Sequence, residues 1–398
     1  MTPERAPAVL VVTSTYPRWP GDDGPGFVHE LCRRLVERGL DVDVLAPSFP
    51  QSLRNETMDG VSVTRFRYFL PRWETLAYDG GIVPKLKQNP FRWLLVPFFL
   101  VGLTSAMRTH LRRRAYDVVH AHWIIPQGLC AALLCRSRAR PALLVTAHGT
   151  DLLGLTRLGL LKRFALRHCR HVTVVSGHLR QLLIDSFALD ERSVTVAPMG
   201  VDLHERFTPQ RDAPPQEDSV LFVGRLTAEK GCSHLIDAVA RVRQRRPGIR
   251  LIIVGDGPLR TALTAQAHSL GIADRVRFEG AVPQHRLPAY YASAALGVVP
   301  SVSEGFGLTI VEAMGCGCPV LASDLPAIRD IVEHERTGLL ATPADPEDLA
   351  TGIDRLLSDR ALAAALARAA RDRVVENFAW PQAAARYATL LSQARDPG

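Results

Sequence analysis

The sequence SEGFGLTIVEAMGCGCPVLAS, residues 303–323, decides the fold. A strand-like apolar run at 296–301 precedes it, a glycine-containing loop carries Glu304, and a helix begins near Leu308 with Glu312 in its early turns. Glycines let backbone N–H groups approach a ligand closely, and a helix N-terminus favours an anion. Beside an anion, a carboxylate is costly unless ligand hydroxyls hydrogen-bond to it, and sugars and riboses supply such hydroxyls. Alone, the two glutamates fit a solvated helix start equally well, so the neighbouring motifs decide.

Outward from this segment, short β-branched runs alternate with helical patterns along almost the whole chain. The predicted strands cover residues 8–14, 41–47, 61–66, 117–123, 142–149, 171–176 and 193–199, and then SVLFVGR, IRLIIVGDG, RVRFEGAV, LGVVPS and PVLASD. Apolar strands that alternate with amphipathic helices are typical of parallel sheets covered by helices on both faces. The predicted fold class is therefore α/β, with two doubly wound domains in tandem and ligands at the carboxyl ends of the strands.

A break in this rhythm predicts the domain boundary. The stretch TPQRDAPPQED at 208–218 is rich in proline and charge and has no apolar period, so we interpret it as a linker. We accordingly expect a first domain over 1–207 and a second over 219–379, followed by a terminal helical segment at 380–398. A length of 398 residues agrees with at least two domains.

The charge of the chain is unevenly distributed. Its 48 Lys and Arg exceed its 40 Asp and Glu by eight, and the whole excess lies in residues 1–205, which contain 26 basic and 18 acidic side chains. This bias indicates an anionic partner, such as a membrane surface, a phosphorylated substrate or nucleic acid, although an arginine-rich composition alone produces the same drift. The apolar fraction of 47% and the charged fraction of 22% exclude disordered and fibrous classes.

The cysteines and the apolar segments indicate the compartment. Seven cysteines without a C-x-x-C pair are typical of buried thiols in a reducing cytosol. The N-terminus enters a strand-like run at Ala8 with no cleavable signal pattern. The longest apolar stretch, residues 93–107, is shorter than the roughly 18–20 residues that span a bilayer. We therefore expect a cytoplasmic protein without a membrane span.

Two further motifs of the second domain point to phosphate chemistry. In FVGRLTAEKGC, residues 222–232, Arg225 and Lys230 flank the first strand-to-helix turn. There the planar guanidinium of the arginine and the compact ammonium of the lysine can hold a diphosphate. In isolation these charges fit a solvated loop equally well. The tight turn IIVGDGP at 252–258 ends the next strand and adds little by itself.

Histidines end two predicted strands of the first domain. His120 and His122 lie on the same face of one strand, and His148 ends another, in TAHGTD with Asp151 close behind. No further ligand has the spacing of a zinc site, so we predict none. Histidines at the carboxyl ends of adjacent parallel strands indicate the wall of a cleft.

In combination, these motifs resemble the retaining nucleotide-sugar glycosyltransferases of family four, which have the GT-B fold. The resemblance covers residues 8–392 and is carried, in order, by PGFVHELCRRLVERG, HAHW, AHGTD, APMGVD, GRLTAEKG, GDGP, RFEGAV and the E-x7-E run EGFGLTIVEAMGCGCPVLAS. It implies an acceptor-binding first domain, a donor-binding second domain, and a final helix that crosses back onto the first domain.

The resemblance also implies the role of each site residue. Arg225 and Lys230 are expected to hold the donor diphosphate, Glu304 to contact the transferred sugar, and His148 to lie beside the reacting centre. The remaining expected donor contacts are the backbone of Gly305, Phe306, Gly307, Leu308 and Thr309, the carboxylate of Glu312 at the ribose, the segment around Val282 at the base, and Gly26 at the diphosphate. The first-domain loop, GDDGPG, departs from the family's usual paired glycines. The expected acceptor-side cleft comprises His120, His122 and Asp151.

The implied reaction moves a sugar from a UDP- or GDP-linked donor to an acceptor hydroxyl with retention of configuration, without metal or cofactor. The arginine, the lysine and the helix N-terminus would stabilise the departing diphosphate. Alternatives are a sugar-nucleotide epimerase of the same fold and a catalytically silent sugar-nucleotide-binding protein. A phosphorylase is disfavoured because none of the four lysines has a pyridoxal phosphate context, and a dehydrogenase because no G-x-G-x-x-G follows the first strand. Dispersed charge disfavours nucleic-acid binding.

The acceptor is expected to be a lipid-linked saccharide in lipopolysaccharide, exopolysaccharide or glycolipid synthesis. Residues 85–114 form an apolar helix candidate flanked by six basic residues, namely Lys85, Lys87, Arg92, Arg112, Arg113 and Arg114. Such a segment predicts peripheral binding to the inner face of the cytoplasmic membrane. An ordinary helix that covers the first sheet is the alternative interpretation of its apolar side.

Overall fold

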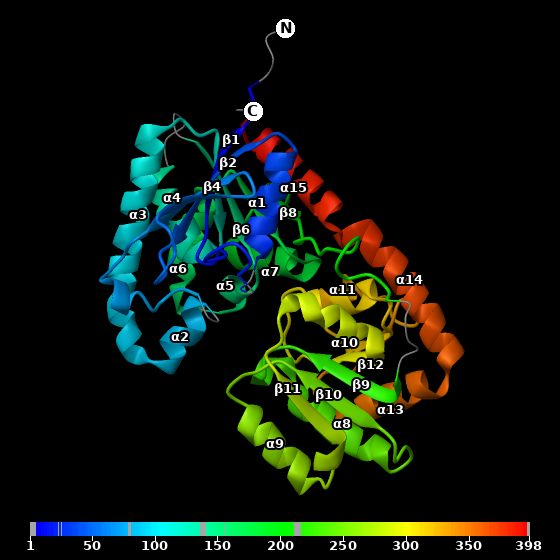
Figure 1. The fold of residues 1–398 in the computed structure, drawn as a ribbon. Helices are drawn as coiled ribbons and strands as arrows, with labels where there is room; N and C mark the ends of the chain where they lie inside the picture. Colours follow the sequence, from blue (N-terminus) through cyan, green and yellow to red (C-terminus); the bar gives the residue numbers. More distant parts are fainter. Residues whose placement is uncertain are drawn as a thin grey trace. The chain divides into compact units, whose positions relative to one another are not determined.

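The computed structural model describes residues 5–22, 24, 26–78, 81–135, 141–154, 156–210 and 216–395. The chain forms two compact units, one of Met1–Gly200 with Pro381–Gly398 and the other of Val201–Trp380. Each unit contains one largely parallel sheet with helices packed on its faces (Figure 1). The predicted α/β class with two doubly wound units is confirmed.

The sheet of the first unit has the strand order β3-β4-β2-β1-β5-β6-β7-β8. Its strands are β1 (Ala8–Val12), β2 (Asp41–Pro47), β3 (Asn55–Met58), β4 (Val61–Phe66), β5 (Val118–His122), β6 (Ala142–Ala147), β7 (His171–Val174) and β8 (Val194–Val196). The central strands β1 and β5 are buried throughout, as expected for a parallel sheet covered on both faces. Strand β3 was not predicted, and it pairs antiparallel with β4 through a turn at Asp59-Gly60, where both residues have positive φ.

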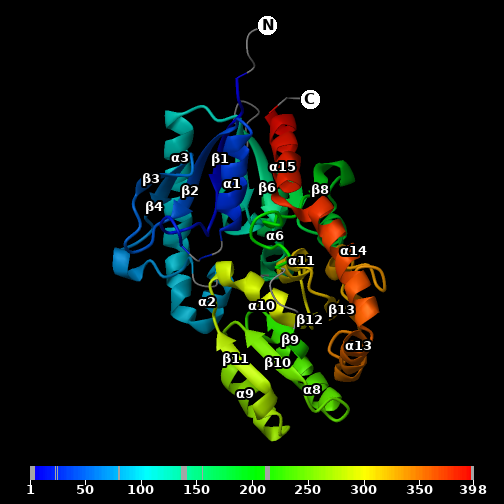
Figure 2. The same cartoon turned by 45° about the vertical axis from the view of Figure 1, so that its right-hand side comes forward.

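Helices cover both faces of this sheet. They are α1 (Phe27–Glu37), α2 (Ile82–Gln88), α3 (Val96–Arg113), α4 (Leu129–Leu134), α5 (Thr150–Leu153), α6 (Gly159–Arg167) and α7 (Gly177–Phe187), with short turns η1 (Pro71–Trp73), η2 (Pro90–Leu95), η3 (Ile124–Gly128), η4 (Thr156–Leu158) and η5 (Glu191–Ser193). Helix α4 packs between α3 and α6. Helix α1 lies beside α15 (Trp380–Arg395), where the Arg38 guanidinium donates to the carbonyl of Pro381 (Figure 2).

The second unit has the strand order β11-β10-β9-β12-β13-β14, all parallel. Its strands are β9 (Gln216–Val223), β10 (Arg250–Val254), β11 (Val276–Gly280), β12 (Ala294–Val299), β13 (Val320–Ser323) and β14 (Leu339–Ala341). Its helices are α8 (Cys232–Arg243), α9 (Arg260–Ser269), α10 (Leu287–Ser293), α11 (Leu308–Gly315), α12 (Pro326–Arg329), α13 (Pro346–Ser358) and α14 (Arg360–Phe378), with turns η6 (Ala228–Lys230), η7 (Ala273–Arg275) and η8 (Gln284–Arg286).

The boundary between the units differs from the predicted one. The second unit begins at Val201, before the predicted linker, because the Arg371 guanidinium of α14 donates to the carbonyls of Leu203 and Phe207. Residues 216–218 of the predicted linker belong to β9, and residues 211–215 lie outside the described residues. The final helix begins at Trp380, and Pro381 and the residues after it belong to the first unit.

The apolar segment of the first unit is longer than the sequence indicated. Within the described part of the chain, Pro90–Arg113 is a helix of 24 residues, long and apolar enough to cross a membrane by length and composition alone. One such helix is weak evidence for a span. Only 22% of its most apolar window is buried, and its buried side chains, Phe99, Leu103 and Met107, pack within this unit.

Candidate active site

The second unit brings Lys230 and Glu304 into direct contact at the carboxyl edge of its sheet. Lys230 ends η6, which follows β9, and Glu304 lies in the loop between β12 and α11. The Lys230 Nζ lies 2.6 Å from Glu304 Oε2, and the Ser301 hydroxyl donates to the same oxygen at 3.3 Å. Two motifs that are 74 residues apart in sequence are therefore joined by an ion pair. The part played by Ser301 was missed, because a serine before a glycine-rich loop carries no distinctive signal.

Gly231 makes this contact geometrically feasible. Its φ is +65°, and a β-carbon at this position would lie only 1.9 Å from the carbonyl oxygen of Pro300. The two loops are also joined through the Glu229 carbonyl, which accepts from the backbone N–H of Val302 at 2.9 Å. A residue with a side chain would separate the loops, so the glycine after Lys230 sets the position of the lysine.

Arg225 and the start of α11 provide further groups for an anion. The Arg225 side chain is half exposed, and its nearest acidic group, on Glu229, lies 3.8 Å away. Gly307 precedes α11 with a φ of +107°. The first-turn N–H groups of such a helix, here at Leu308 and Thr309, have no partner within the helix. The Phe306 side chain is buried against Phe378, so only its backbone is available to a ligand.

Glu312 of the same unit is buried and has two polar partners. Gln284 Nε2 donates to Glu312 Oε1 at 3.3 Å, and the Tyr291 hydroxyl donates to Oε2 at 3.1 Å. Burial raises the pKa of Glu312 to about 7, against the opposing effect of these hydrogen bonds. Val282 is half-buried in the loop that precedes Gln284. Gln284 and Tyr291 were not predicted as site residues, because neither belongs to a recognisable motif.

Three histidines of the first unit, His120, His122 and His148, form one cluster. His122 Nδ1 lies 3.0 Å from His148 Nε2, and the His120 and His122 ring centroids are 4.3 Å apart. His148 follows β6 and is half-buried. Its ring contacts that of Trp123 at 4.6 Å between centroids. The clustering predicted from strand periodicity is present in this unit.

The expected cleft wall requires correction. His120 and His122 are fully buried, because their strand is covered on both faces, so neither lines a surface. Asp151 is also buried, and its carboxylate accepts the backbone N–H of Ile124 at 2.8 Å and that of His148 at 3.1 Å. Asp151 holds the loop of His148 in place, and His122 contacts the His148 ring, so within this unit the three predicted side chains belong to its interior.

The remaining predicted position in the first unit is Gly26, which immediately precedes α1 with a φ of −91°. The nearest atom to a β-carbon built there would be the Gly24 carbonyl oxygen, at 3.9 Å, so the fold of this unit does not itself require glycine. Asp23 and Pro25 of the same loop lie outside the described residues.

Carboxylates do not gather into a metal site in the described ranges. Among these residues there is no group of three or more His, Cys, Asp or Glu side chains that could hold a metal ion. The chain contains one D-x-D sequence, Asp41-Val42-Asp43, and both carboxylates pair with Arg114. This ion pair accounts for the two aspartates structurally.

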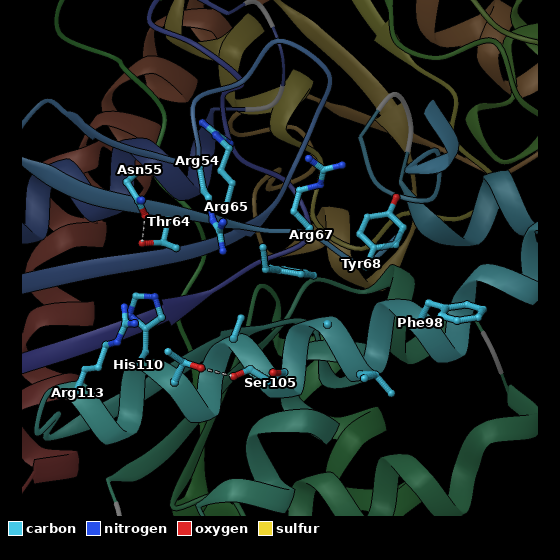
Figure 3. A pocket seen from close by; sticks show the side chains of 15 residues that line it. Arg54, Asn55, Thr64, Arg65, Arg67, Tyr68, Phe98, Ser105, His110 and Arg113 are labelled. Carbon is cyan, nitrogen blue, oxygen red and sulfur yellow. Dashed lines mark hydrogen bonds between the residues drawn. The ribbon is translucent and has the colours of Figure 1, made fainter. Parts of the chain in front are cut away.

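A groove of about 700 Å³ lies in the first unit between β4 and α3 (Figure 3). Thr64, Phe66 and Tyr68 line it from the strand, and Phe98, Val101, Ser105, Thr109, His110 and Arg113 line it from the helix. Arg113 and His110 extend from α3 toward the strands, whereas Arg54 and Arg67 lie on the strand side and their side chains point away from α3 (Figure 3). None of the predicted site residues belongs to this groove.

Comparisons with known proteins identify the family of the chain. Residues 26–205 match the model described as Glycosyltransferase Family 4, and residues 204–373 match that of Glycosyl transferases group 1. The chain is 32% identical to a D-inositol 3-phosphate glycosyltransferase of Nocardiopsis dassonvillei, over 92% of this chain and 90% of the relative. It is also 32% identical to the GDP-mannose-dependent alpha-(1-6)-phosphatidylinositol monomannoside mannosyltransferase of Mycolicibacterium smegmatis, over 82% and 90% of the two chains.

A solved structure extends the likeness to the fold. The sucrose-phosphate synthase of Thermosynechococcus elongatus superposes with a TM-score of 0.81 at 25% identity, over 97% of this chain and 98% of that one. Its two Rossmann-like units are those of the GT-B fold, in agreement with the two parallel sheets described above. The chain therefore belongs to the GT-B glycosyltransferases whose two halves are the family 4 and group 1 glycosyltransferase domains.

Proposed function

We propose that this glycosyltransferase is a retaining, metal-independent hexosyltransferase that uses a UDP- or GDP-linked sugar. The contact between Lys230 and Glu304, beside Arg225 and the start of α11, carries the proposal. Lys230 and Glu304 lie at the same edge of the sheet. The ammonium group can therefore bind a diphosphate while the carboxylate accepts hydrogen bonds from hydroxyls of the attached sugar. We expect the buried carboxylate of Glu312, on the same α11, to accept hydrogen bonds from ribose hydroxyls.

The proposed reaction needs no metal because the chain supplies the positive charge. As the bond between the sugar C1 and the diphosphate oxygen breaks, the electron pair moves to the phosphate, where Lys230, Arg225 and the first-turn N–H groups stabilise it. The acceptor oxygen forms the new bond to C1 on the face that the leaving group occupied. Its proton passes to the departing phosphate. Configuration at C1 is thereby retained.

A donor screen tests the first half of the proposal. The melting temperature of the full chain is measured with a panel of UDP- and GDP-sugars, because binding to the folded state stabilises it. We expect one nucleotide sugar to raise it more than the others, with and without EDTA. Turnover of that donor with an acceptor must give a product of unchanged anomeric configuration by NMR. Inversion, or strict dependence on Mg²⁺ or Mn²⁺, would refute the proposed mechanism.

The same assay separates the alternatives. An epimerase converts the nucleotide sugar in the absence of any acceptor, whereas a transferase requires one. A silent binding protein gives the melting shift but no turnover with any acceptor. The Glu304 and Lys230 contact favours transfer, because a protein that only binds nucleotide sugar has no need of a carboxylate directed at the sugar.

We further propose that the acceptor is lipid-linked and that the first unit binds the membrane peripherally. Exposed apolar side chains gather on η1, η2 and the start of α3, namely Leu70, Trp73, Phe91, Trp93, Leu94, Phe98 and Val101. Phe98 and Val101 also line the groove of Figure 3, whose lining residues include arginines and no carboxylate. The similarity to a phosphatidylinositol monomannoside mannosyltransferase supports a lipid acceptor.

The basic flanks of this segment are fewer than its sequence indicated. Lys85 is buried and donates to the Ala77 carbonyl, and Arg114 pairs with Asp41 and Asp43. Lys87, Arg112 and Arg113 are exposed. These cations, together with Arg108 on the same helix, are the ones that an anionic membrane surface would attract.

A further inference from the structure

Three neutral histidines lie one behind another in the first unit, and only the outermost is accessible. His148 is half-buried, whereas His122 and His120 are fully buried. Burial lowers the pKa of His148 and of His120 to about 3, and it lowers the pKa of His122 well below its usual value. Each ring is therefore neutral near pH 7 and has one N–H group and one acceptor nitrogen.

The orientation of the His148 ring is determined by its neighbours. It is stacked on the His122 ring, with 5.2 Å between centroids and 18° between planes, and it also contacts the rings of Trp123 and Phe27. Its Nε2 atom lies 3.0 Å from Nδ1 of His122. Because this hydrogen bond uses Nε2, the ring nitrogen of His148 that remains for a ligand is Nδ1.

The protonation of His122 then determines the tautomer of His148. The buried Nε2 atom of His122 has no hydrogen-bond partner among the described residues. Buried N–H groups without a partner are rarer in folded proteins than under-satisfied acceptors. The proton of His122 is therefore placed on Nδ1, from which it is donated to Nε2 of His148. His148, being neutral, must hold its own proton on Nδ1.

We propose that His122 is a positioning residue that holds His148 in the Nδ1–H tautomer, so that this N–H is the group that His148 offers to a hydroxyl oxygen of a sugar substrate. The identity of the ligand rests on the proposed function, whereas the tautomer follows from the first unit alone. A neutral imidazole suits this hydrogen bond, because it keeps its Nδ1 proton through the reaction at neutral pH.

His120 lies next to the His122 ring, and its own ring is fixed by its contacts. Its Nε2 atom lies 2.7 Å from the Thr146 hydroxyl, which in turn lies 2.6 Å from the Thr173 hydroxyl. The ring of Tyr387, on α15, is stacked on His120 with 5.6 Å between centroids. The H-x-H pattern of β5 thus has a structural reason, because the first histidine fixes the ring of the second.

The wild-type protein tests the tautomer directly. Imidazole ¹⁵N spectra of the full chain are recorded at pH 7 with histidine selectively labelled, and the His148 signals are assigned by their loss in His148→Gln. We expect a protonated Nδ1 and an unprotonated Nε2 for His148. A protonated Nε2 would overturn the proposal, whether or not a sugar donor has been found.

Variants test the positioning role. His122→Phe keeps a ring in the core but removes the hydrogen bond, and it should lower kcat by between about tenfold and a hundredfold while KM for the donor changes less than about threefold. In that variant the His148 signals should shift to a mixture of tautomers. His122→Asn, which restores an N–H donor near Nδ1, should recover most of both properties.

The control variant is His171→Phe, which removes a histidine that contacts Thr195 on β8 and leaves the cluster intact. It should change neither kcat nor the His148 signals. If His122→Phe keeps the wild-type tautomer and kcat, His122 is a core residue only and the proposal fails. If no donor is turned over but the tautomer responds as expected, the proposed function fails and the positioning role stands.

Discussion

Glu304 is the residue on which the proposed chemistry depends most. We predict that Glu304→Gln largely abolishes transfer but leaves donor binding detectable, because the side chain keeps its shape and loses the charge that serves the sugar. Donor binding is followed by the melting shift and transfer by the initial rate. If the variant keeps more than about a tenth of kcat, the loss of transition-state stabilisation is under ~1.4 kcal/mol and the role assigned to Glu304 is wrong.

The two cations of the same edge should affect both binding and rate. Lys230→Ala and Arg225→Ala each remove a partner of the diphosphate, and each should cost roughly 1.5–3 kcal/mol of donor binding or transition-state stabilisation. Arg241→Ala is the matched control, because it removes an exposed cation of α8 that contacts only the backbone of its own helix. Equal effects of all three substitutions would show that overall charge, and not a site, determines donor affinity.

The pKa of Glu312 predicts a pH dependence of donor binding. Its folded-state pKa is raised to about 7, so the carboxylate is mostly ionised at pH 8 and mostly protonated at pH 6. Ribose hydroxyls need the ionised form as acceptor, so donor affinity should fall as the pH drops through 7, by at most about tenfold per pH unit. The groups that act on this carboxylate are Gln284, Tyr291 and Arg206.

The measurement uses an intact nucleotide sugar, because the terminal phosphate of a free nucleoside diphosphate itself titrates near pH 6. Dissociation constants are determined at intervals between about pH 5.5 and 8.5, on both sides of the carboxyl pKa. In Glu312→Gln the affinity should be independent of pH over this interval. A pH dependence that persists in the variant would assign the titration to another group.

Among the elements, the loop between β9 and α8 shows how strictly the backbone positions the site. Gly231→Ala places a β-carbon against the Pro300 carbonyl in a left-handed conformation, so the two loops must separate and Lys230 must move away from Glu304. We expect lower thermal stability and loss of most donor binding. Gly271→Ala is the control, because its φ of +67° is nearly the same but open space surrounds the new methyl group.

The two variants distinguish the cost of a left-handed backbone conformation from the effect of moving Lys230 away from Glu304. Both should lose about 1–2 kcal/mol of stability through the left-handed conformation alone. Only Gly231→Ala should lose donor binding in addition, measured by the melting shift with the preferred nucleotide sugar. Wild-type donor affinity in Gly231→Ala would mean that the separation of the two loops does not matter to the site.

Most elements were predictable because their cores are strongly patterned. The apolar runs at β1, β2 and β4 begin where the sequence indicated, since a proline, an aspartate or a glycine stands at or directly before each start. Strand β3, NETM, was not predicted, because it has little apolar character and exists only through its pairing with β4. Strand β14 is similarly short and depends on its contact with β13.

The site was predictable where motifs carry backbone constraints, and not elsewhere. Lys230 and Glu304 belong to glycine-containing loops whose conformation the sequence reveals, and the structure places them in contact. Gln284 and Tyr291 reach Glu312 only through the packing of η8 and α10 against α11, which no local pattern encodes. His120 and His122 were assigned to a surface because strand periodicity gives the face of a strand but not what covers it.

At the scale of the whole molecule, the distribution of charge and of exposed aromatic side chains predicts where the protein binds. The net charge of +8 arises entirely within residues 1–205, and the exposed apolar side chains of η1, η2 and α3 belong to the same unit. An anionic surface attracts the cations at about 1 kcal/mol each, and the headgroup region accepts tryptophan and phenylalanine. The core of this unit does not account for these exposed apolar side chains.

We therefore predict salt-sensitive binding to vesicles of phosphatidylcholine mixed with phosphatidylglycerol, and little binding to phosphatidylcholine alone, by co-sedimentation. The double substitution Phe91→Ser with Trp93→Ser should lower the partition coefficient by about tenfold or more, because two apolar side chains no longer enter the headgroup region. Leu160→Ser is the matched control, since Leu160 is 85% exposed, comparable with Phe91 at 81%, but lies on α6. Equal partition to neutral and anionic vesicles, or an unchanged coefficient in the double variant, would leave a water-soluble acceptor as the better hypothesis.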